Sequence, residues 1–285
     1  MSALILEKTP LDPGRITRLV IKAPQIAQKA LPGNFVIVRV SDKGERIPLT
    51  IADTDPEAGT ITIVFLVMGK STAVMNTLEA GDDIHDLCGP LGKPAHIVPR
   101  GTVVCVGGGT GIAAMHNIAK AHRRIGNRVI SILGARTESL LIMQEEFGRA
   151  SDEVVISTND GSKGVKGLVT DALREVLAAH KPGEIGEIIA IGPVPMMQAV
   201  CNMTKPLELP TTVSINSIMV DGIGMCGACR VTVGGVTKFS CVDGPEFDGH
   251  QVDFEELQRR LTAFNSQEQQ AYDAFLNKCG CHENN

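Results

Sequence analysis

The stretch VVCVGGGTGIAA, residues 103–114, places four glycines between an apolar, β-branched run and the start of a helical pattern. Glycines let a backbone approach a pyrophosphate closely, and the free N–H groups at a helix start face such an anion. Residues 109–114 fit the dinucleotide-binding fingerprint G-x-G-x-x-A. A nucleotide-binding turn is therefore predicted, with a tight turn that binds nothing as the alternative. The candidate binding residues are Gly108, Gly109, Thr110 and Gly111.

Strand-like and helical segments alternate through the residues that follow this turn. The strand-like runs are 128–133, 153–158 and 187–192, and the helical patterns cover 138–147, 168–180 and 195–204. This alternation is typical of a parallel, doubly wound sheet. We predict an α/β domain that binds NAD(H) or NADP(H) over residues 99–210.

The end of the second strand of this domain bears on nucleotide preference. An acidic residue that binds the ribose normally lies about 20 residues beyond the glycines. This region offers Arg136 and Glu138, and an arginine can equally accept the 2′-phosphate of NADP. Charge alone therefore leaves NAD and NADP open.

Residues 1–98 have the pattern of an all-β domain. Short β-branched runs are separated by turn residues such as Pro32-Gly33 and Ala80-Gly81. About six strands at this spacing predict a small antiparallel barrel.

Residues 211–250 contain three cysteines in a frame that resembles a four-ligand site. Two-iron clusters of the plant ferredoxin type use C-x4-C-x2-C followed by a distant cysteine. Here Asp221 takes the first position, and Cys226, Cys229 and Cys241 take the others. We predict a [2Fe-2S] cluster with Asp221 as the fourth ligand. Zinc, or a substitute ligand from the tail (Cys279, Cys281 or His282), is the alternative.

Composition and charge exclude some classes of function and indicate a cellular location. The net charge of −5 provides no basic surface for nucleic acid, and no run approaches the roughly 20 apolar residues of a membrane span. The start of the chain does not resemble a signal peptide, which favours a cytoplasmic protein in which closely spaced cysteines bind metal. Residues 251–285 are charged and helical in pattern.

A barrel, a GGGTG nucleotide domain and a C-terminal cysteine loop, in this order, resemble the ferredoxin–NADP reductase superfamily. More narrowly, the chain resembles electron-transfer subunits of dihydroorotate dehydrogenase and small subunits of NADH-dependent reduced ferredoxin:NADP oxidoreductases. This resemblance implies FAD. It implies flavin contacts in ERIPLTIAD and FLVMGKSTAVM, from Arg46, Pro48, Leu49, Thr50, Phe65, Leu66, Val67, Gly69, Ser71 and Thr72. It also implies contacts to the pyridine nucleotide from Asp160, Gly192, Pro193 and Met196.

Apparent sites for a nicotinamide, a flavin and an iron–sulfur cluster on one chain predict a converter between two-electron and one-electron transfer. The resemblance implies a heterodimer with a larger, glutamate-synthase-like flavin and iron–sulfur subunit. This chain would form the NAD(H) arm of electron bifurcation that involves ferredoxin and NADP(H). The alternatives are an electron-transfer subunit of dihydroorotate dehydrogenase, of a cytosolic hydrogenase or of a sulfur reductase. A nucleotide-binding regulatory module with structural zinc is the alternative from another class.

Overall fold

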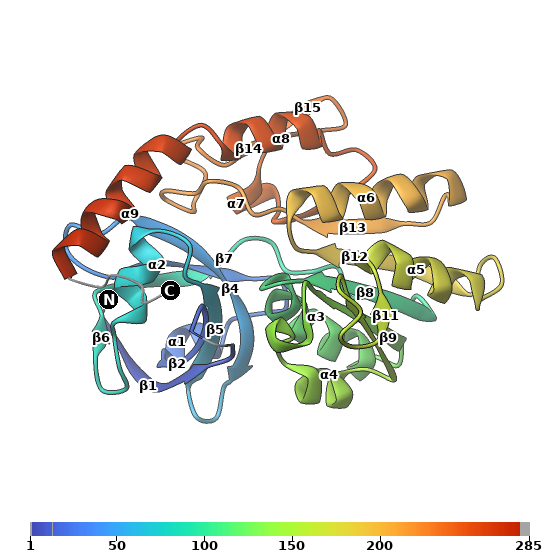
Figure 1. Cartoon of the computed structure of the whole chain (residues 1–285), viewed down its shortest axis with the longest axis horizontal. Helices are drawn as coiled ribbons and strands as arrows, with labels where there is room; N and C mark the ends of the chain where they lie inside the picture. The colour runs from blue at the N-terminus through green and yellow to red at the C-terminus, as the bar shows by residue number, and fades with distance from the viewer. Residues whose placement is uncertain (1, 13, 280–285) are drawn as a thin grey trace.

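The computed structural model describes residues 2–12 and 14–279. An antiparallel sheet of seven strands in the order β6-β1-β2-β5-β4-β3-β7 rolls into the predicted N-terminal barrel (Figure 1). Its strands are β1 (Ala3–Pro10), β2 (Ile16–Lys22), β3 (Phe35–Arg39), β4 (Arg46–Asp55), β5 (Thr60–Leu66), β6 (Asp83–Ile84) and β7 (Asp86–Leu91). Two short helices, α1 (Pro24–Ala27) and α2 (Lys70–Asn76), accompany them.

The barrel core follows from alternation along its strands. Ile61, Ile63 and Phe65 of β5 point inward and join the buried apolar cluster of the barrel. Val64 lies between Ile63 and Phe65, and Leu66 follows Phe65. Both point outward and pack against the second domain. One strand thus contributes to two cores.

A second seven-stranded sheet has the order β11-β10-β9-β8-β12-β13-β16. Every pairing in it is parallel except that of the last strand, as the sequence pattern predicted. The strands are β8 (Thr102–Gly108), β9 (Arg128–Ala135), β10 (Glu153–Thr158), β11 (Val165–Lys166), β12 (Ile185–Ile191), β13 (Thr211–Ser214) and β16 (Glu246–Asp248).

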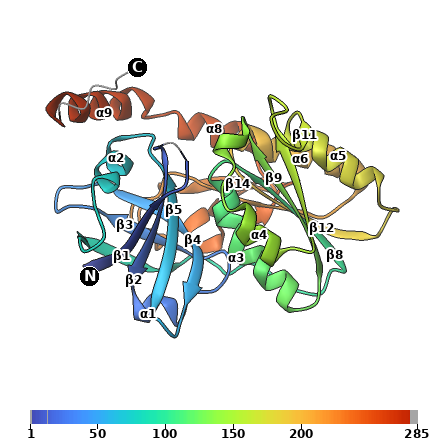
Figure 2. The same cartoon turned by 60° about the horizontal axis from the view of Figure 1, so that its bottom comes forward.

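Helices cover both faces of this sheet (Figures 1 and 2). Helices α3 (Gly111–Arg124) and α4 (Gln144–Ala150) contribute to the apolar cluster shared with the barrel, whereas α5 (Val169–Ala178) and α6 (Val194–Thr204) pack on the opposite face. The short 3-10 turns are η1 (Glu138–Leu140) and η2 (Lys205–Leu207).

The structure differs from the sequence pattern in two places. The helix predicted over 138–147 is interrupted, because Leu141, Ile142 and Met143 enter the shared core as irregular chain and Met143 has a left-handed φ of 57°. The sheet also continues past residue 210, since β13 and β16 add two strands to its edge. Burial of apolar side chains therefore overrides the local helical pattern.

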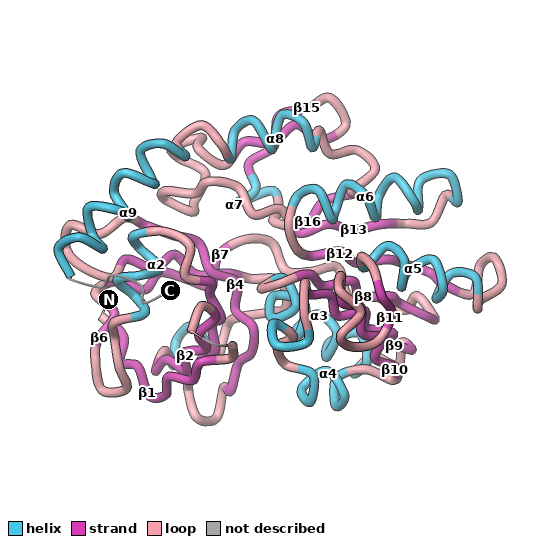
Figure 3. Tube along the Cα trace, in the orientation of Figure 1, coloured by secondary structure: helices cyan, strands magenta, loops and turns pink. Residues whose placement is uncertain are grey.

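The C-terminal part lies over both domains. A hairpin of β14 (Arg230–Val233) and β15 (Val236–Phe239) leads into α7 (Ser240–Asp243), and β16 is followed by α8 (Phe254–Leu261) and α9 (Asn265–Cys279). Helix α9 crosses back and packs against α2 of the barrel (Figures 2 and 3). None of the helices in the described part of the chain combines the length and apolarity needed to span a membrane.

Candidate functional site

The predicted nucleotide turn links β8 to α3 at the carboxyl end of the parallel sheet. Gly109 has φ of 56°, a left-handed conformation that favours glycine. Gly111 begins α3 so close to the end of β12 that a Cβ there would overlap the carbonyl oxygen of Ile191. The helix start therefore lies where the strand order reverses between β8 and β12, the position at which doubly wound sheets bind their ligands.

Gly192, Pro193 and Met196 follow β12 at this same end of the sheet. A Cβ on Gly108 would overlap Met196 Sδ, and one on Gly192 would lie 2.8 Å from Met196 Cε. The half-buried thioether thus fills the space that these two glycines leave open. The structure brings these predicted residues together with the glycine turn.

The loops after β9 and β10 also meet at this edge of the sheet. Ser162 Oγ accepts a hydrogen bond from the backbone N–H of Glu138 and donates one to Asp160 Oδ1. The hydrogen bond from Ser162 holds the pKa of the Asp160 carboxyl below its usual value. Lys163 pairs with Glu138 at 3.1 Å, and Arg136 is exposed beside them. The two loops thus form one hydrogen-bonded unit.

The candidate flavin residues of β4 divide between its two faces. Pro48 pairs with Ile37 and Thr50 with Phe35, so both point outward from the barrel. Leu49 instead packs against the barrel core. Its side chain therefore lies on the face opposite to Pro48 and Thr50, because successive strand residues alternate.

Of the second flavin segment, Phe65 is 2% exposed inside the barrel, whereas Leu66 faces the nucleotide domain. Past β5 the chain turns at Gly69 into α2. Thr72 Oγ1 accepts hydrogen bonds from the backbone N–H groups of Met68 and Gly69, at 3.1 and 3.2 Å. Thr72 thus stabilises the start of α2.

Arg46, Val67 and Ser71 complete the candidate flavin residues. Arg46 is exposed at the start of β4. Val67 continues β5, where its N–H donates to the Arg15 carbonyl at 2.7 Å, and the Ser71 hydroxyl donates to Glu45. Val67 packs against the barrel core, as Leu49 does, whereas Arg46 is exposed.

The cysteine loop brings its four predicted ligands into two pairs. Cys229 Sγ and Cys241 Sγ lie 3.2 Å apart and are buried, each 1% exposed. Asp221 accepts hydrogen bonds from the backbone N–H groups of Ile223, at 3.0 Å, and Cys226, at 2.6 Å. These bonds, that of Ile223 foremost, hold the pKa of the Asp221 carboxyl below its usual value.

The distance between the two buried sulfurs can be compared with that of two thiolates bound to one metal ion. Among the described residues, three or more His, Cys, Asp or Glu side chains nowhere converge tightly enough for a single ion. Two thiolates on one tetrahedral metal stand roughly 3.7 Å apart for metal–sulfur bonds of about 2.3 Å. The sulfurs of Cys229 and Cys241 are about 0.5 Å closer than that, and Asp221 is bonded to the backbone N–H of Cys226. Burial raises the pKa of the Cys241 thiol to about 12, so a bound cation is needed to hold it as thiolate.

The cysteine loop packs directly on the barrel. Cys229, Cys241 and Met219 share a buried cluster with Phe35 and Ile37 of β3. These two barrel residues are the cross-strand partners of Thr50 and Pro48. Opposite residues in antiparallel strands have Cα atoms about 4.5–5.5 Å apart. The candidate flavin residues and the candidate cluster ligands therefore meet on one face of the barrel.

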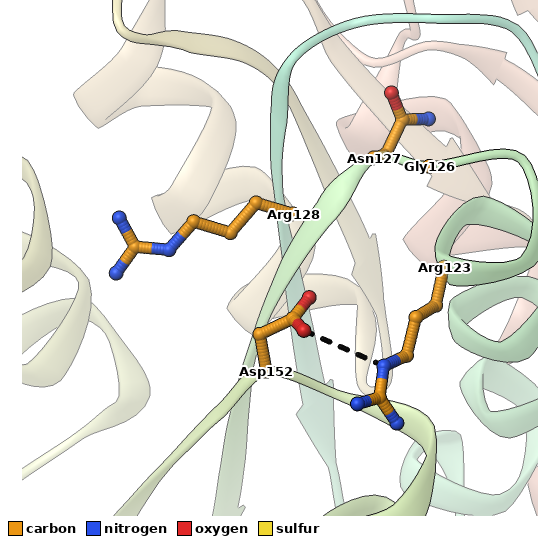
Figure 4. A pocket seen from close by; sticks show the side chains of 5 residues that line it. All are labelled: Arg123, Gly126, Asn127, Arg128 and Asp152. Atoms are coloured by element: carbon orange, nitrogen blue, oxygen red, sulfur yellow. Dashed lines mark ion pairs between the residues drawn. The ribbon is translucent and has the colours of Figure 1, made fainter.

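Two features have no signal in the sequence pattern. Helix α3 is bonded to β4 through His116 and Lys120, contacts that depend on how the two domains pack. A hollow of about 450 Å³ between Arg123, Gly126, Asn127, Arg128 and Asp152 lies at the amino ends of β9 and β10 (Figure 4). It lies at the end of the sheet opposite to the glycine turn and contains none of the predicted residues.

The tail candidates are not placed by the structure. The side chain of Cys279, together with Cys281 and His282, lies outside the described residues.

Two family profiles match the chain. Residues 216–253 match the iron-sulfur cluster binding domain of dihydroorotate dehydrogenase B, and residues 105–202 match the oxidoreductase NAD-binding domain. These ranges contain the four predicted cluster ligands and the glycine turn, respectively.

Relatives match nearly the whole chain. A dihydroorotate dehydrogenase B (NAD(+)) electron transfer subunit homolog of Thermotoga maritima is 48% identical over 260 residues, covering 91% of each chain. The electron transfer subunit of Bacillus caldolyticus dihydroorotate dehydrogenase B is 32% identical, covering 84% of this chain and 93% of that one.

Solved structures agree with the fold. A chain from the structure of an NADH-dependent reduced ferredoxin-NADP oxidoreductase, studied for flavin-based electron bifurcation, has a TM-score of 0.90 and 45% identity. The match covers 96% of this chain and 97% of that chain. Ferredoxin-NADP+ reductase of Plasmodium falciparum, 16% identical with a TM-score of 0.56, shares the fold.

Proposed function

Because this chain belongs to the family of dihydroorotate dehydrogenase B electron-transfer subunits and their homologues, we propose that it carries electrons between NAD(H), FAD, a [2Fe-2S] cluster and a larger partner subunit. The family makes it an oxidoreductase subunit. The direct contact between the cysteine loop and the strand next to Pro48 and Thr50 carries the proposal, because electron transfer requires cofactors that lie close together.

We assign the FAD to the outer face of β4 and to the turn before α2. Thr50 offers a hydroxyl on that face, Pro48 an apolar surface, and Arg46 a charge for the pyrophosphate. Gly69, Ser71 and Thr72 offer backbone and hydroxyl groups at the turn. For Leu49 and Phe65, which pack in the barrel core, any contact to FAD comes from the backbone.

We assign the nicotinamide nucleotide to the glycine turn, with its pyrophosphate at the N-terminus of α3 and its nicotinamide toward Gly192, Pro193 and Met196. Arg136 and Asp160 flank the adenosine end in this arrangement. The flavin supplies the conversion of a hydride into two single electrons. The protein positions the two rings and excludes water from between them.

We assign the cluster to the loop, where Asp221, Cys226, Cys229 and Cys241 would hold it and it would supply one-electron transfer. The N–H groups of Ile223 and Cys226 orient the Asp221 carboxylate in the free chain. The burial of Cys229 and Cys241 against Phe35 and Ile37 excludes solvent on the barrel side.

For the partner, we propose that the larger subunit binds over the cysteine loop. Four apolar side chains are exposed on or beside this loop, by 46%, 51%, 82% and 38%: Val220, Ile223, Met225 and Val242. Exposed apolar patches of this kind mark protein interfaces.

The 45% identity with the chain from the NADH-dependent reduced ferredoxin-NADP oxidoreductase supports an NAD(H) arm of a bifurcating heterodimer. The six cysteines whose side chains the structure describes form no disulfides with one another, which supports a cytoplasmic location.

Anaerobic purification of this chain, together with any proteins that copurify with it, tests these assignments. We expect about one FAD and two irons per copy of this chain, and reduction of the flavin by NADH or NADPH. The rates with the two nucleotides decide which one the chain prefers. Colourless material, or yellow material without iron, would refute the electron-transfer role. Reduction of the larger subunit by dihydroorotate would instead favour the dihydroorotate dehydrogenase alternative.

A further inference from the structure

Helix α3 connects the candidate nucleotide site to β4, the strand that carries candidate flavin residues. It begins at Gly111, in the glycine turn, and its body packs against β4, the strand that carries Thr50. His116 lies five residues into the helix, about 7.5 Å along its axis from Gly111 at 1.5 Å per residue. Ile112, His116 and Lys120 recur every four residues and so form one stripe along the helix.

Two side chains of this stripe contact β4 directly. His116 Nδ1 lies 3.3 Å from the carbonyl oxygen of Ala52, and Lys120 Nζ lies 2.6 Å from Asp53 Oδ1. Ala52 lies two residues after Thr50, at an irregularity in the register of β4 with β5, and packs in the apolar cluster that the barrel shares with the nucleotide domain. The polar contacts between helix and barrel therefore hold the backbone next to the candidate flavin residue.

The chemistry of His116 fits a structural donor. The side chain is 5% exposed, and its ring meets the ring of Phe147 edge to face at 5.4 Å. Burial lowers the pKa of the imidazole, against an opposite effect of Asp53, so the ring is neutral at pH 7. A neutral ring that faces a carbonyl oxygen through Nδ1 carries its proton on Nδ1. Asp53 Oδ2 also lies 3.9 Å from His116 Nδ1, but the nearer Lys120, at 2.6 Å, matches the charge of Asp53.

We propose that His116 and Lys120 are positioning residues for hydride transfer, which fix the nucleotide turn relative to the flavin strand. This inference rests on the proposed function. The hydride that leaves NADH, giving NAD+, is taken up with one solvent proton as FADH2. Transfer needs reacting atoms about 3–3.5 Å apart, and a shift of 1 Å can reduce the rate about 100-fold. Because the turn lies within one domain and β4 within the other, contacts between α3 and β4 set this distance.

The inference predicts that substitutions at these positions lower the rate of flavin reduction but barely change the affinity for NADH. In His116→Phe the ring packing on Phe147 is kept, but the bond to Ala52 is lost. We expect the rate of flavin reduction at saturating NADH, measured by stopped flow per bound FAD, to fall at least tenfold. The Kd of NADH should change less than about threefold, because the turn itself is intact. Lys120→Met, on a partly exposed side chain, should also slow the reaction and should fold normally.

Two matched variants separate positioning from general destabilisation. His116→Asn places an amide N–H where Nδ1–H stood and should restore the rate to within about threefold of the wild type. His122→Asn changes another buried histidine of α3, which contacts Asn127 within its own domain, and should leave the rate unchanged. Wild-type rates in both His116→Phe and Lys120→Met would overturn the inference, as would a loss explained entirely by weaker NADH binding. If the wild-type flavin is not reduced by NADH or NADPH, the proposed function fails, and this inference fails with it.

Discussion

At the scale of single residues, two carboxyl groups have unusual positions: one stands where a cysteine ligand is expected, and the other has a buried oxygen. Asp221 stands where a ferredoxin frame has cysteine, and two backbone N–H groups hold its carboxylate. Glu246 lies at the junction of the barrel and the cluster segment, and its buried Oε1 has no hydrogen-bond partner among the described residues. Each of these groups gives a testable consequence.

Exchanging the ligand at position 221 tests the cluster assignment. We expect Asp221→Cys to keep two irons per chain and to change the reduction potential, because ligand type and net charge tune cluster potentials. Asp221→Ala, which removes the ligand without replacing it, should lower the iron content. Iron analysis and potentiometry of the anaerobic protein measure both effects. Full iron content and an unchanged potential in Asp221→Ala would eliminate Asp221 as a ligand.

The pH dependence of stability tests Glu246. Burial foremost, and then the charge of Glu187, raise the pKa of its carboxyl to about 8. The folded state therefore retains a proton that the unfolded chain releases near its ordinary pKa of about 4.3. This group's contribution to stability is full below pH 4 and is lost as the pH rises through 8. We expect Glu246→Gln to raise the melting temperature relative to the wild type at pH 8.5 and to have little effect at pH 5. An equal shift at both pH values would show that Glu246 is not titrating.

At the scale of elements, the close approach between the start of α3 and the end of β12 controls the nucleotide turn. The glycine at 111 is required by packing rather than by a left-handed conformation, since its φ is not positive. The sequence pattern indicates the turn, but only the packed sheet shows which carbonyl group restricts it.

A pair of glycine substitutions measures this restriction. Gly111→Ala would overlap the Ile191 carbonyl, and we expect it to lower the free energy of unfolding by about 1–3 kcal/mol and to weaken NADH binding. Gly148→Ala, in α4, meets no atom within 4 Å and should be neutral or stabilise by about 0.5–1 kcal/mol. Denaturant unfolding and NADH titration of the two variants make the comparison. Equal effects would show that the approach of α3 to β12 is unimportant.

At the scale of the whole molecule, the barrel, the nucleotide domain and the cysteine loop share two apolar clusters. One joins α3 and α4 to the outer face of the barrel, and the other joins the cysteine loop to β3. The cysteine loop thus lies between the barrel and solvent, and its exposed side chains remain available for a partner.

Charged substitutions on this loop test where the larger subunit binds. We expect Met225→Lys, or Ile223→Lys, to reduce copurification of the larger subunit at least tenfold, while iron and FAD content stay at wild-type levels. Leu207→Lys is the matched control, since Leu207 is 58% exposed in η2, away from the loop. Pull-down of the tagged chain measures all three. Undiminished copurification with both loop variants would place the interface elsewhere.

Local patterns along the chain predict the order of the domains, the parallel sheet and the spacing of the cysteine frame. These depend on local periodicity, on glycines and on short intervals along the chain. The packed fold was needed to show that Leu49 and Phe65 pack inside the barrel, that residues 141–143 are not helical, and that His116 contacts Ala52. The reason is physical: strand register and the packing of one domain on another depend on contacts between residues far apart in the chain, and no local pattern contains them.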